Sequence, residues 1–394
     1  DKSGRTFNNP YQYFFEQMHM DDAIYADESI YEYPMQQGGG NDGRPYSFGR
    51  PSSGGSKAAY PCKSYGQGRI NPAYFYGIFD PNDMRRDVSI TMTGSNGKGV
   101  EKLIPFVPNS KAEGGGLTLN KWDENRQANP WVAAQRKSGI NGPYMRMSEV
   151  YLGYAEVCAA LGDVVTGKQY LKTVRERSFP QGLADTDGFI ASFGNDLVRA
   201  IIEERGFEYA GEGDRRWTLI RSGYLPEDIK RIKDMTKAMM DGLATKGYYE
   251  FENGNIISAY IWTKLVDAKT IYGHRLTAQC PMDKVNDPVL YPGWRGQKDN
   301  WEEMGLNYGN SAPATNLAIK GLFEIVSEEE AASLESQGYA KVNWGIDLVD
   351  YRDEYDKYLF WDYDYVSAPI YLWPFTPNLM AAGGFTNGYG FKQE

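Results

Sequence analysis

Hydrophobic residues recur with a helical period near the middle of the chain. In RMSEVYLGYAEVCAAL, residues 146–161, they fall at Met147, Val150, Tyr151, Tyr154, Cys158 and Leu161. Steps of three or four positions place such residues on one face of an α-helix, and we expect that face to be buried. Gly162 and Asp163 interrupt the run and should end the helix.

Further helical patterns follow in short succession. GKQYLKTVRER (167–177) predicts a second helix with Leu171 and Val174 inward, and residues 195–210 predict a third with Asn195 as its N-cap. Residues 215–221 predict a short fourth helix, and PEDIKRIKDMTKAMMDGL (226–243) predicts a longer fifth. Successive helix pairs indicate tetratricopeptide-like hairpins, each of which buries its apolar face on the next. The predicted class is therefore mainly α.

The rest of the chain has the pattern of loops with a few short elements. Residues 14–33 predict a short helix and a strand, and DVSITMT (87–93) and GLTLNKW (116–122) predict strands. SEEEAASLESQ (327–337) predicts an exposed helix with Ser327 as N-cap and Glu330 completing a capping box. We expect one domain over 1–394, with a loop-rich region at 1–140, helix pairs at 141–243 and a second loop-rich region at 244–394.

Charged residues crowd the segment IIEERGFEYAGEGDRRWTLIRSG, residues 201–223. On a helix over 196–209, its acids lie three or four positions apart. Gly211 and Gly213 allow a turn that returns the later arginines toward these acids, and an arginine fork can hold two carboxylate oxygens. We therefore expect a structural ion-pair network of Glu204, Arg205, Glu208, Glu212, Arg215 and Arg221. The catalytic alternative, an acid–base pair of carboxylates, would need unpaired acids in a cleft.

Composition narrows the function classes. The formal net charge of -10 argues against non-specific nucleic-acid binding, which needs a basic surface. The two histidines, His19 and His274, leave little for a His-based metal site or catalyst, so no metal or cofactor is expected. The acidic DPND loop (80–83) is a weak candidate for Ca²⁺, because its oxygen spacing is not that of an EF-hand loop.

The cysteines, the lack of a long apolar run and the first residue add further expectations. Cys158 lies in a helical pattern and should be core, while a disulfide between Cys62 and Cys280 is possible but not established by the sequence. No stretch of ~18 apolar residues is present that could span a bilayer. The chain starts at Asp1 without an initiating Met, which we interpret as a processed or truncated start.

Five segments, in order along the chain, resemble the SusD/RagB family. PYMRMSEVYLGYAEVCAALGD (143–163) resembles the family helix with an Arg followed by Ser-Glu and Ala-Glu, and YLKTVRER (170–177) resembles the next helix, with Val-Arg-x-Arg. EERGFEYAGEGDRRWTLIRSG (203–223) is similar to the family segment in which Glu-Arg is followed by Glu-Leu-Ala-Phe-Glu-Gly and then by Arg-Trp-Phe-Asp-Leu. GRINPAYFYGIFDPNDMRRDVSI (68–90) and APIYLWPFTPNLMAAGGFTNGYGF (368–391) resemble an earlier and the closing pattern.

The resemblance has limits. Gly211 stands where the family usually has Phe, Arg216 where it has Trp, and Thr218 where it has Asp, which puts local packing and one salt bridge in doubt. The matching segments span about 68–391. The family's N-terminal part, with its first helix pairs and lipid-bearing Cys, is expected to be missing from this chain.

The resemblance implies a function. SusD-like proteins capture nutrients, mostly oligosaccharides and sometimes peptides, on the outer face of the outer membrane, where a lipid anchor holds them. They cover a SusC-like TonB-dependent transporter and are not enzymes. A glycan hydrolase with two facing carboxylates, or a helical adaptor that binds only proteins, are the alternatives that the residues leave open.

The resemblance also directs attention to aromatic side chains in loops. The chain has 30 tyrosines and nine tryptophans, and its aromatic content of 14% offers many rings on which a sugar could stack. The first candidate is Trp131, flanked by Arg126, Asn129 and Arg136 as hydrogen-bonding groups. Tyr65 and Tyr76 rank second, and Trp294 and Trp301 could form a separate patch or face the transporter. Trp122 is expected to be structural, and Trp217 and Trp373 are expected to be core.

Overall fold

The computed structural model describes a defined part of the chain. The described residues are 11, 14–15, 18, 28–36, 47–51, 64, 66–95, 101–106, 116–122, 139–179, 181–267, 315–353, 364, 366–367, 369–371 and 375–384. Cys62 and Cys280 lie outside them, so their possible disulfide stays a prediction.

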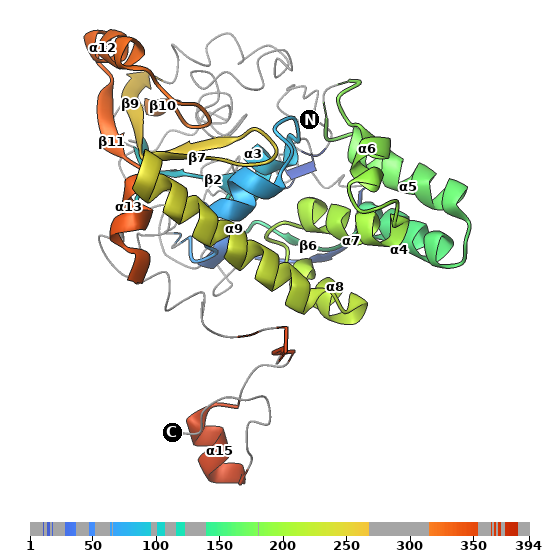
Figure 1. Cartoon of the computed structure of the whole chain (residues 1–394). Coiled ribbons are helices and arrows are strands. Elements are labelled where there is room, and N and C mark those ends of the chain that lie inside the picture. The colour runs from blue at the N-terminus through green and yellow to red at the C-terminus, as the bar shows by residue number, and fades with distance from the viewer. Residues whose placement is uncertain are drawn as a thin grey trace.

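Helices dominate the middle of the molecule, which confirms the mainly α prediction. They are α4 (Met147–Ala160), α5 (Val164–Glu176), α6 (Thr186–Ala191), α7 (Leu197–Glu208), α8 (Asp214–Ser222) and α9 (Leu225–Lys246). The sequence pattern had predicted all of these except α6. α5 packs beside α4, and both contact α7 (Figure 1). The apolar side chains that join these three helices include Leu152, Leu171 and Ile201.

The N-caps explain where the helices begin. Asp163, Asp185 and Asp196 accept hydrogen bonds from the backbone N–H groups of Thr166, Gly188 and Arg199. The prediction of Asn195 as N-cap of α7 was therefore wrong by one residue. Asn195 itself has a left-handed backbone, with φ of 66°, a conformation that Asn tolerates better than most residues.

The predicted inward face of α4 was wrong in part: Cys158 is buried and Tyr151 packs against the core, but Val150, Tyr154 and Leu161 do not face inward. The helix buries Ser148, Leu152, Ala155 and Cys158, whereas Val150, Tyr154, Val157 and Leu161 are exposed on the opposite face. Both faces carry apolar residues, so periodicity could not show which one is buried. Cys158 is a buried free thiol, as expected.

The strands are short and antiparallel. β9 (Tyr260–Asp267) pairs with β10 (Thr315–Lys320) on one side and with β11 (Ala340–Asn343) on the other. The two-stranded sheets pair β1 (Ser29–Tyr33) with β6 (Gly142–Arg146), β2 (Ile90–Thr91) with β5 (Thr118–Leu119), β3 (Thr93–Ser95) with β4 (Glu101–Leu103), and β7 (Tyr248–Glu250) with β8 (Ile256–Ser258). Residues 87–93 are thus only partly extended, because α3 (Arg85–Ser89) occupies their first half.

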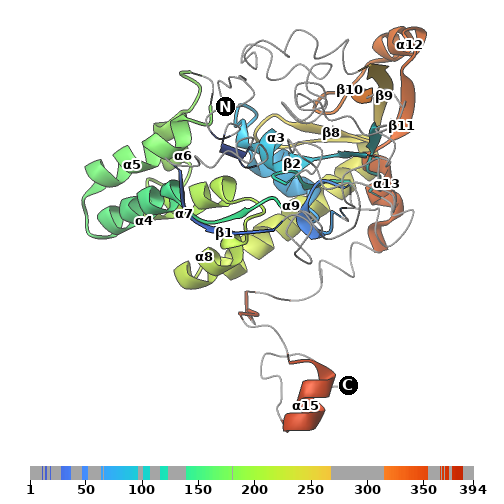
Figure 2. The same ribbon diagram turned by 180° about the vertical axis from the view of Figure 1, so that it is seen from behind.

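Four further short elements complete the described part of the chain. They are η1 (Tyr74–Ile78), α12 (Glu328–Ser336), α13 (Gly345–Asp350) and α15 (Pro377–Gly383). α12 has the predicted capping box between Ser327 and Glu330. The three-stranded sheet lies at the opposite side of the molecule from α4 and α5, with α9 running between them (Figures 1 and 2). None of the helices among the described residues is long and apolar enough to cross a membrane.

The largest hydrophobic cluster joins η1, α9 and β9. Phe75 and Tyr76 pack there with Met239, Ile261 and Trp344. Trp122 is buried, as expected, but Trp217 is 58% exposed, so its assignment to the core was wrong. Trp373 lies outside the described residues.

Candidate functional site

The densest group of charges surrounds Glu208 on α7, inside the protein. One Glu208 oxygen accepts hydrogen bonds from Arg146 at 2.8 Å and from Arg177, and the other accepts one from Arg85 at 3.3 Å. The side chain of Glu208 is 0% exposed. Three arginines from different segments therefore converge on one buried carboxylate.

The same cluster continues through the neighbouring acids. Glu204 accepts from Arg85 at 2.6 Å and from Arg175 at 2.9 Å. Glu212 accepts from both Lys121, at 2.6 Å, and Arg146. These contacts join α7 to α3, α5 and β6, so the cluster connects elements that are distant in sequence.

A second cluster links α7, α8 and α9. Glu203 accepts hydrogen bonds from Arg215 at 2.9 Å and from Arg231 at 2.7 Å. Both arginines also donate to Asp228 of α9, at 3.0 and 2.6 Å. Arg205 forms a separate ion pair with Asp214, which opens α8.

The pKa values follow from these contacts. Burial alone would raise the pKa of Glu208, but the charges of Arg177, Arg146 and Arg85 outweigh burial and hold that pKa well below its usual range. Burial opposes ionisation of Glu203 in the same way, yet Arg215 and Arg231 lower its pKa to about 2. Both carboxylates therefore remain ionised at neutral pH.

Five of the six network residues expected from the sequence are thus in buried or half-buried ion pairs. Arg221 differs: its guanidinium pairs with Glu156 of α4 and is 47% exposed, so it does not return to the acids of α7. The sequence reasoning missed the partners Arg85, Lys121, Arg146, Arg175, Arg177 and Arg231. Arg146, Arg175 and Arg177 lie in the family-like Arg-x-Ser-Glu and Val-Arg-x-Arg motifs, which were the available signal.

The structure contradicts the prediction that Tyr76 binds a ligand. It was expected as a ligand residue, but its side chain is 0% exposed and lies in the main core. Its hydroxyl accepts a hydrogen bond from Trp344 Nε1 at 2.9 Å, and its ring stacks near Phe251. An aromatic side chain enclosed in this way cannot stack on a ligand.

The other ligand candidates lie outside the described residues. These are Tyr65, Arg126, Asn129, Trp131, Arg136, Trp294 and Trp301. Within the described part of the chain, no group of His, Cys, Asp or Glu has the arrangement of a metal site. Asp83 of the DPND loop instead forms a buried ion pair with Arg85.

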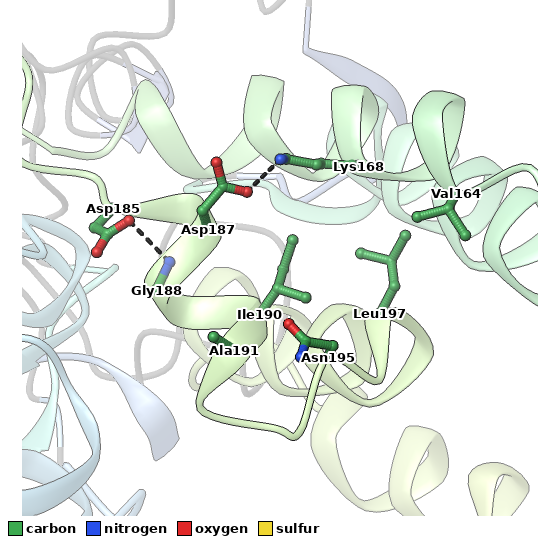
Figure 3. A pocket seen from close by; sticks show the side chains of 9 residues that line it. All are labelled: Val164, Lys168, Asp185, Asp187, Gly188, Ile190, Ala191, Asn195 and Leu197. Atoms are coloured by element: carbon green, nitrogen blue, oxygen red, sulfur yellow. Dashed lines mark hydrogen bonds and ion pairs between the residues drawn. The ribbon is translucent and has the colours of Figure 1, made fainter.

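Two hollows border α6. The smaller, about 630 Å³, lies between Val164 and Leu197 and is crossed by the exposed ion pair of Lys168 with Asp187 (Figure 3). Among its polar groups, Lys168 and Asp187 pair with each other and Asp185 accepts from the backbone N–H of Gly188. It therefore offers few groups for a ligand.

The larger hollow, a groove of about 730 Å³, runs between α6, α7, α9 and β7. Its apolar lining includes Phe189, Phe193, Phe207, Met235, Tyr249 and Phe251. The guanidinium of Arg175 lies 3.9 Å from the centroid of the Phe189 ring. Acidic side chains in the lining are Asp80, Asp83, Asp185, Glu203, Asp234 and Glu252, against two arginines, Arg175 and Arg231. Asp83 and Glu203 are paired with arginines and Asp234 with Lys230, so the negative charge open to a ligand comes mainly from Asp80, Asp185 and Glu252.

Exposed rings gather on a third feature, the pair of strands β1 and β6. We call these two strands the tyrosine ribbon, after Tyr31, Tyr33 and Tyr144. Their exposed fractions are 59%, 59% and 67%. The sequence analysis did not single out these tyrosines as ligand candidates: Tyr144 lies at the start of the family-like segment 143–163, and Tyr31 and Tyr33 lie in the predicted strand within residues 14–33.

The chain is similar to known proteins over most of its length. A sequence model of the SusD family matches residues 4–374. The chain belongs to the SusD family. This agrees with the resemblance found in the individual segments.

The individual relatives of this chain have low sequence identity to it. SusD-like protein P25 of Formosa agariphila is 28% identical over 160 residues, which cover 40% of this chain and 26% of the relative. A SusD homologue from Bacteroides thetaiotaomicron is 18% identical, with 58% of this chain and 47% of that chain covered and a TM-score of 0.42. Surface glycan-binding protein A of the same species, in complex with laminarihexaose, gives 17% identity, 56% and 47% coverage and a TM-score of 0.39. The chain thus matches about a quarter of the curated relative's length and less than half of these solved chains.

Proposed function

We propose that the protein captures nutrient oligosaccharides at the cell surface and passes them to a SusC-like TonB-dependent transporter, without catalysis. A lipid anchor would hold it on the outer face of the outer membrane. The observation that carries the proposal is the family match over residues 4–374. Delivery to the transporter and the lipid anchor are proposed by analogy with the family.

The charge arrangement argues against the buried acids of α7 as a hydrolytic pair. A glycosidase needs one carboxylic acid that is protonated at working pH and a second carboxylate nearby. The buried acids Glu203 and Glu208 have lowered pKa values because two or three arginines face each of them. Neither can act as a proton donor near neutral pH, so the most prominent acids of the fold are not a catalytic pair.

The direct test measures binding and turnover on the same ligands. Isothermal titration against a panel of neutral hexasaccharides, including laminarihexaose, should find at least one that binds. The product of a long incubation should contain no shorter sugars. Turnover that is abolished by one Asp or Glu substitution would instead establish the hydrolase alternative.

Trp131 remains the first ligand candidate from the sequence. We predict that Trp131→Ala weakens binding of that hexasaccharide by roughly 1–2 kcal/mol while the melting temperature stays unchanged, because stacking on one ring contributes an energy of this order. Titration of the wild type and the variant measures the difference. Unchanged affinity would remove Trp131 from the site.

Capture of peptides is the second candidate function, and the groove favours it. Its rings can face a cationic side chain, as Phe189 already faces Arg175, and the acids in its lining outnumber the arginines. Titration with Gly-Arg-Gly and Gly-Glu-Gly distinguishes this function. Binding of the basic peptide alone, lost in Phe193→Ala, would support peptide capture.

A further inference from the structure

The tyrosine ribbon holds three large rings in water. Tyr31 and Tyr144 lie on neighbouring strands with ring centroids 5.7 Å apart and ring planes at 87°. Tyr33 lies two positions after Tyr31 on β1 and is equally exposed. Adjacent exposed aromatic side chains of this kind usually mark a surface that a ligand or partner covers.

Ion pairs and a backbone hydrogen bond hold one end of the tyrosine ribbon in place. Arg146, the last residue of β6, is buried in the ion-pair cluster and also binds Glu28 at 2.7 Å. The backbone N–H of Met147 donates to the carbonyl of Glu28. Both strands are therefore tied to the same cluster at one end, so the rings project from a fixed backbone.

A side-chain bridge fixes the other end of the ribbon. Asn141 donates from Nδ2 to Glu32 at 2.9 Å, and its Oδ1 accepts the backbone N–H of Met35, also at 2.9 Å. Asn141 thus joins the segment before β6 to β1 and to the residue two positions beyond it. Little ordering of the backbone would be required when a ligand binds, which favours affinity.

The chemistry of this face suits a neutral sugar. Among the residues of β1 and β6, the charged ones are Glu32, which is bonded to Asn141, and the buried Arg146. The exposed surface is therefore largely aromatic and uncharged, with one carboxylate that can accept hydrogen bonds from hydroxyl groups. Pyranose rings have the complementary character, an apolar C–H face and a rim of hydroxyls. Within these two strands, Glu32 is the one charged side chain that a strongly charged partner could contact, because Arg146 is buried.

We propose that the tyrosine ribbon is a binding platform for an oligosaccharide, with one sugar ring stacked on Tyr144 or Tyr31 and the perpendicular ring of the pair contacting its edge. Tyr33 contacts the adjoining unit. This inference rests on the proposed function and names a site for it that is separate from Trp131.

The test uses substitutions on the exposed rings. Tyr31→Ala, Tyr33→Ala and Tyr144→Ala should each weaken binding of the hexasaccharide by about fivefold to tenfold. Tyr31→Phe and Tyr144→Phe should bind as the wild type does, because the ring is kept. Tyr351→Ala, at a tyrosine that is 37% exposed outside the ribbon, is the matched control and should have no effect.

A second measurement needs no variant. Tyrosine nitration, mapped by mass spectrometry, should be suppressed by the bound hexasaccharide at Tyr31, Tyr33 and Tyr144 but not at Tyr351. Unchanged affinity in all three alanine variants and unchanged nitration would overturn the ribbon proposal while leaving glycan capture intact, as expected if a protein covers this face. Absence of wild-type binding to every oligosaccharide would overturn both.

Discussion

At the scale of single residues, Glu208 shows what the buried charges do. Its carboxylate is fully enclosed and faces Arg85, Arg146 and Arg177, which come from three separate segments. Removing one member of a buried group strands the charges of the others, a larger cost than the pair contributes. The geometry of this site therefore depends on each member.

We predict that Glu208→Gln lowers the free energy of unfolding by roughly 3–5 kcal/mol, because three arginines lose their common anion. Arg221→Ala is the matched control, since its ion pair with Glu156 is half exposed and should contribute at most about 1 kcal/mol. Urea denaturation followed by circular dichroism measures both. Loss of ligand binding in Glu208→Gln with unaltered unfolding would contradict a structural role.

The hydroxyl of Tyr76 is expected to stabilise the core. Tyr76→Phe should reduce the free energy of unfolding by about 1–3 kcal/mol, because the indole N–H of Trp344 loses its partner inside the core. Oligosaccharide affinity should not change. The same denaturation experiment, with Tyr351→Phe as control, checks stability, and titration checks affinity; weaker binding without destabilisation would return Tyr76 to the ligand site.

At the scale of elements, sequence periodicity predicted most of the helices but not how they pack. The helices α4, α5, α7, α8 and α9 were found because apolar spacing and capping residues are local signals. α4 is apolar on two opposite faces, so only its neighbours decide that Leu152 is inside and Val157 outside. α6 has six residues, too few for a periodic pattern.

The candidate site was less accessible to sequence reasoning for a similar reason. Glu208 was recognised, but Arg85 is 123 positions away from it, and such pairing is set by tertiary structure. Tyr76 was misassigned because the run YFYGIF has the same composition whether it forms a loop or a core segment. Tyr31 and Tyr144 become neighbours only through the pairing of β1 with β6.

The contact between α7, α8 and α9 should depend on pH. The pKa of Glu203 is lowered to about 2 from its ordinary value near 4.5. A carboxyl with a lowered folded-state pKa stabilises the fold above its unfolded pKa, and this stabilisation is lost as the pH falls from about 4.5 toward 2. Wild type should therefore lose up to about 3 kcal/mol through this group over that interval.

Glu203→Gln separates this contribution from that of other acids. The variant should be less stable than wild type at neutral pH, and the difference should narrow steadily as the pH falls below about 4.5. Denaturation curves across this range measure it. A difference that stays constant with pH would mean that the charge of Glu203 does not hold the three helices together.

At the scale of the whole molecule, buried charge and exposed rings have separate roles. The ion-pair clusters join α3, α5, α7 and β6 into one framework, and the tyrosine ribbon is attached to that framework through Arg146. A rigid framework that presents rings on its surface suits capture and release, because binding then requires little rearrangement. The protein as a whole carries a net charge of -10, which repels anions and attracts cations.

This separation predicts how salt affects binding. Stacking of a neutral hexasaccharide on tyrosine involves no net charge. The dissociation constant of the hexasaccharide should therefore stay constant between about 0.05 and about 0.5 M NaCl. Added salt does weaken charge interactions, because it shortens their range to a few ångströms. A basic peptide in the groove would instead bind more weakly as salt rises, because the acids there are screened. Titrations of both ligands at the two salt concentrations, with Tyr144→Ala and Phe193→Ala as site-specific variants, distinguish the two modes. Hexasaccharide affinity that falls steeply with salt would contradict an uncharged binding face.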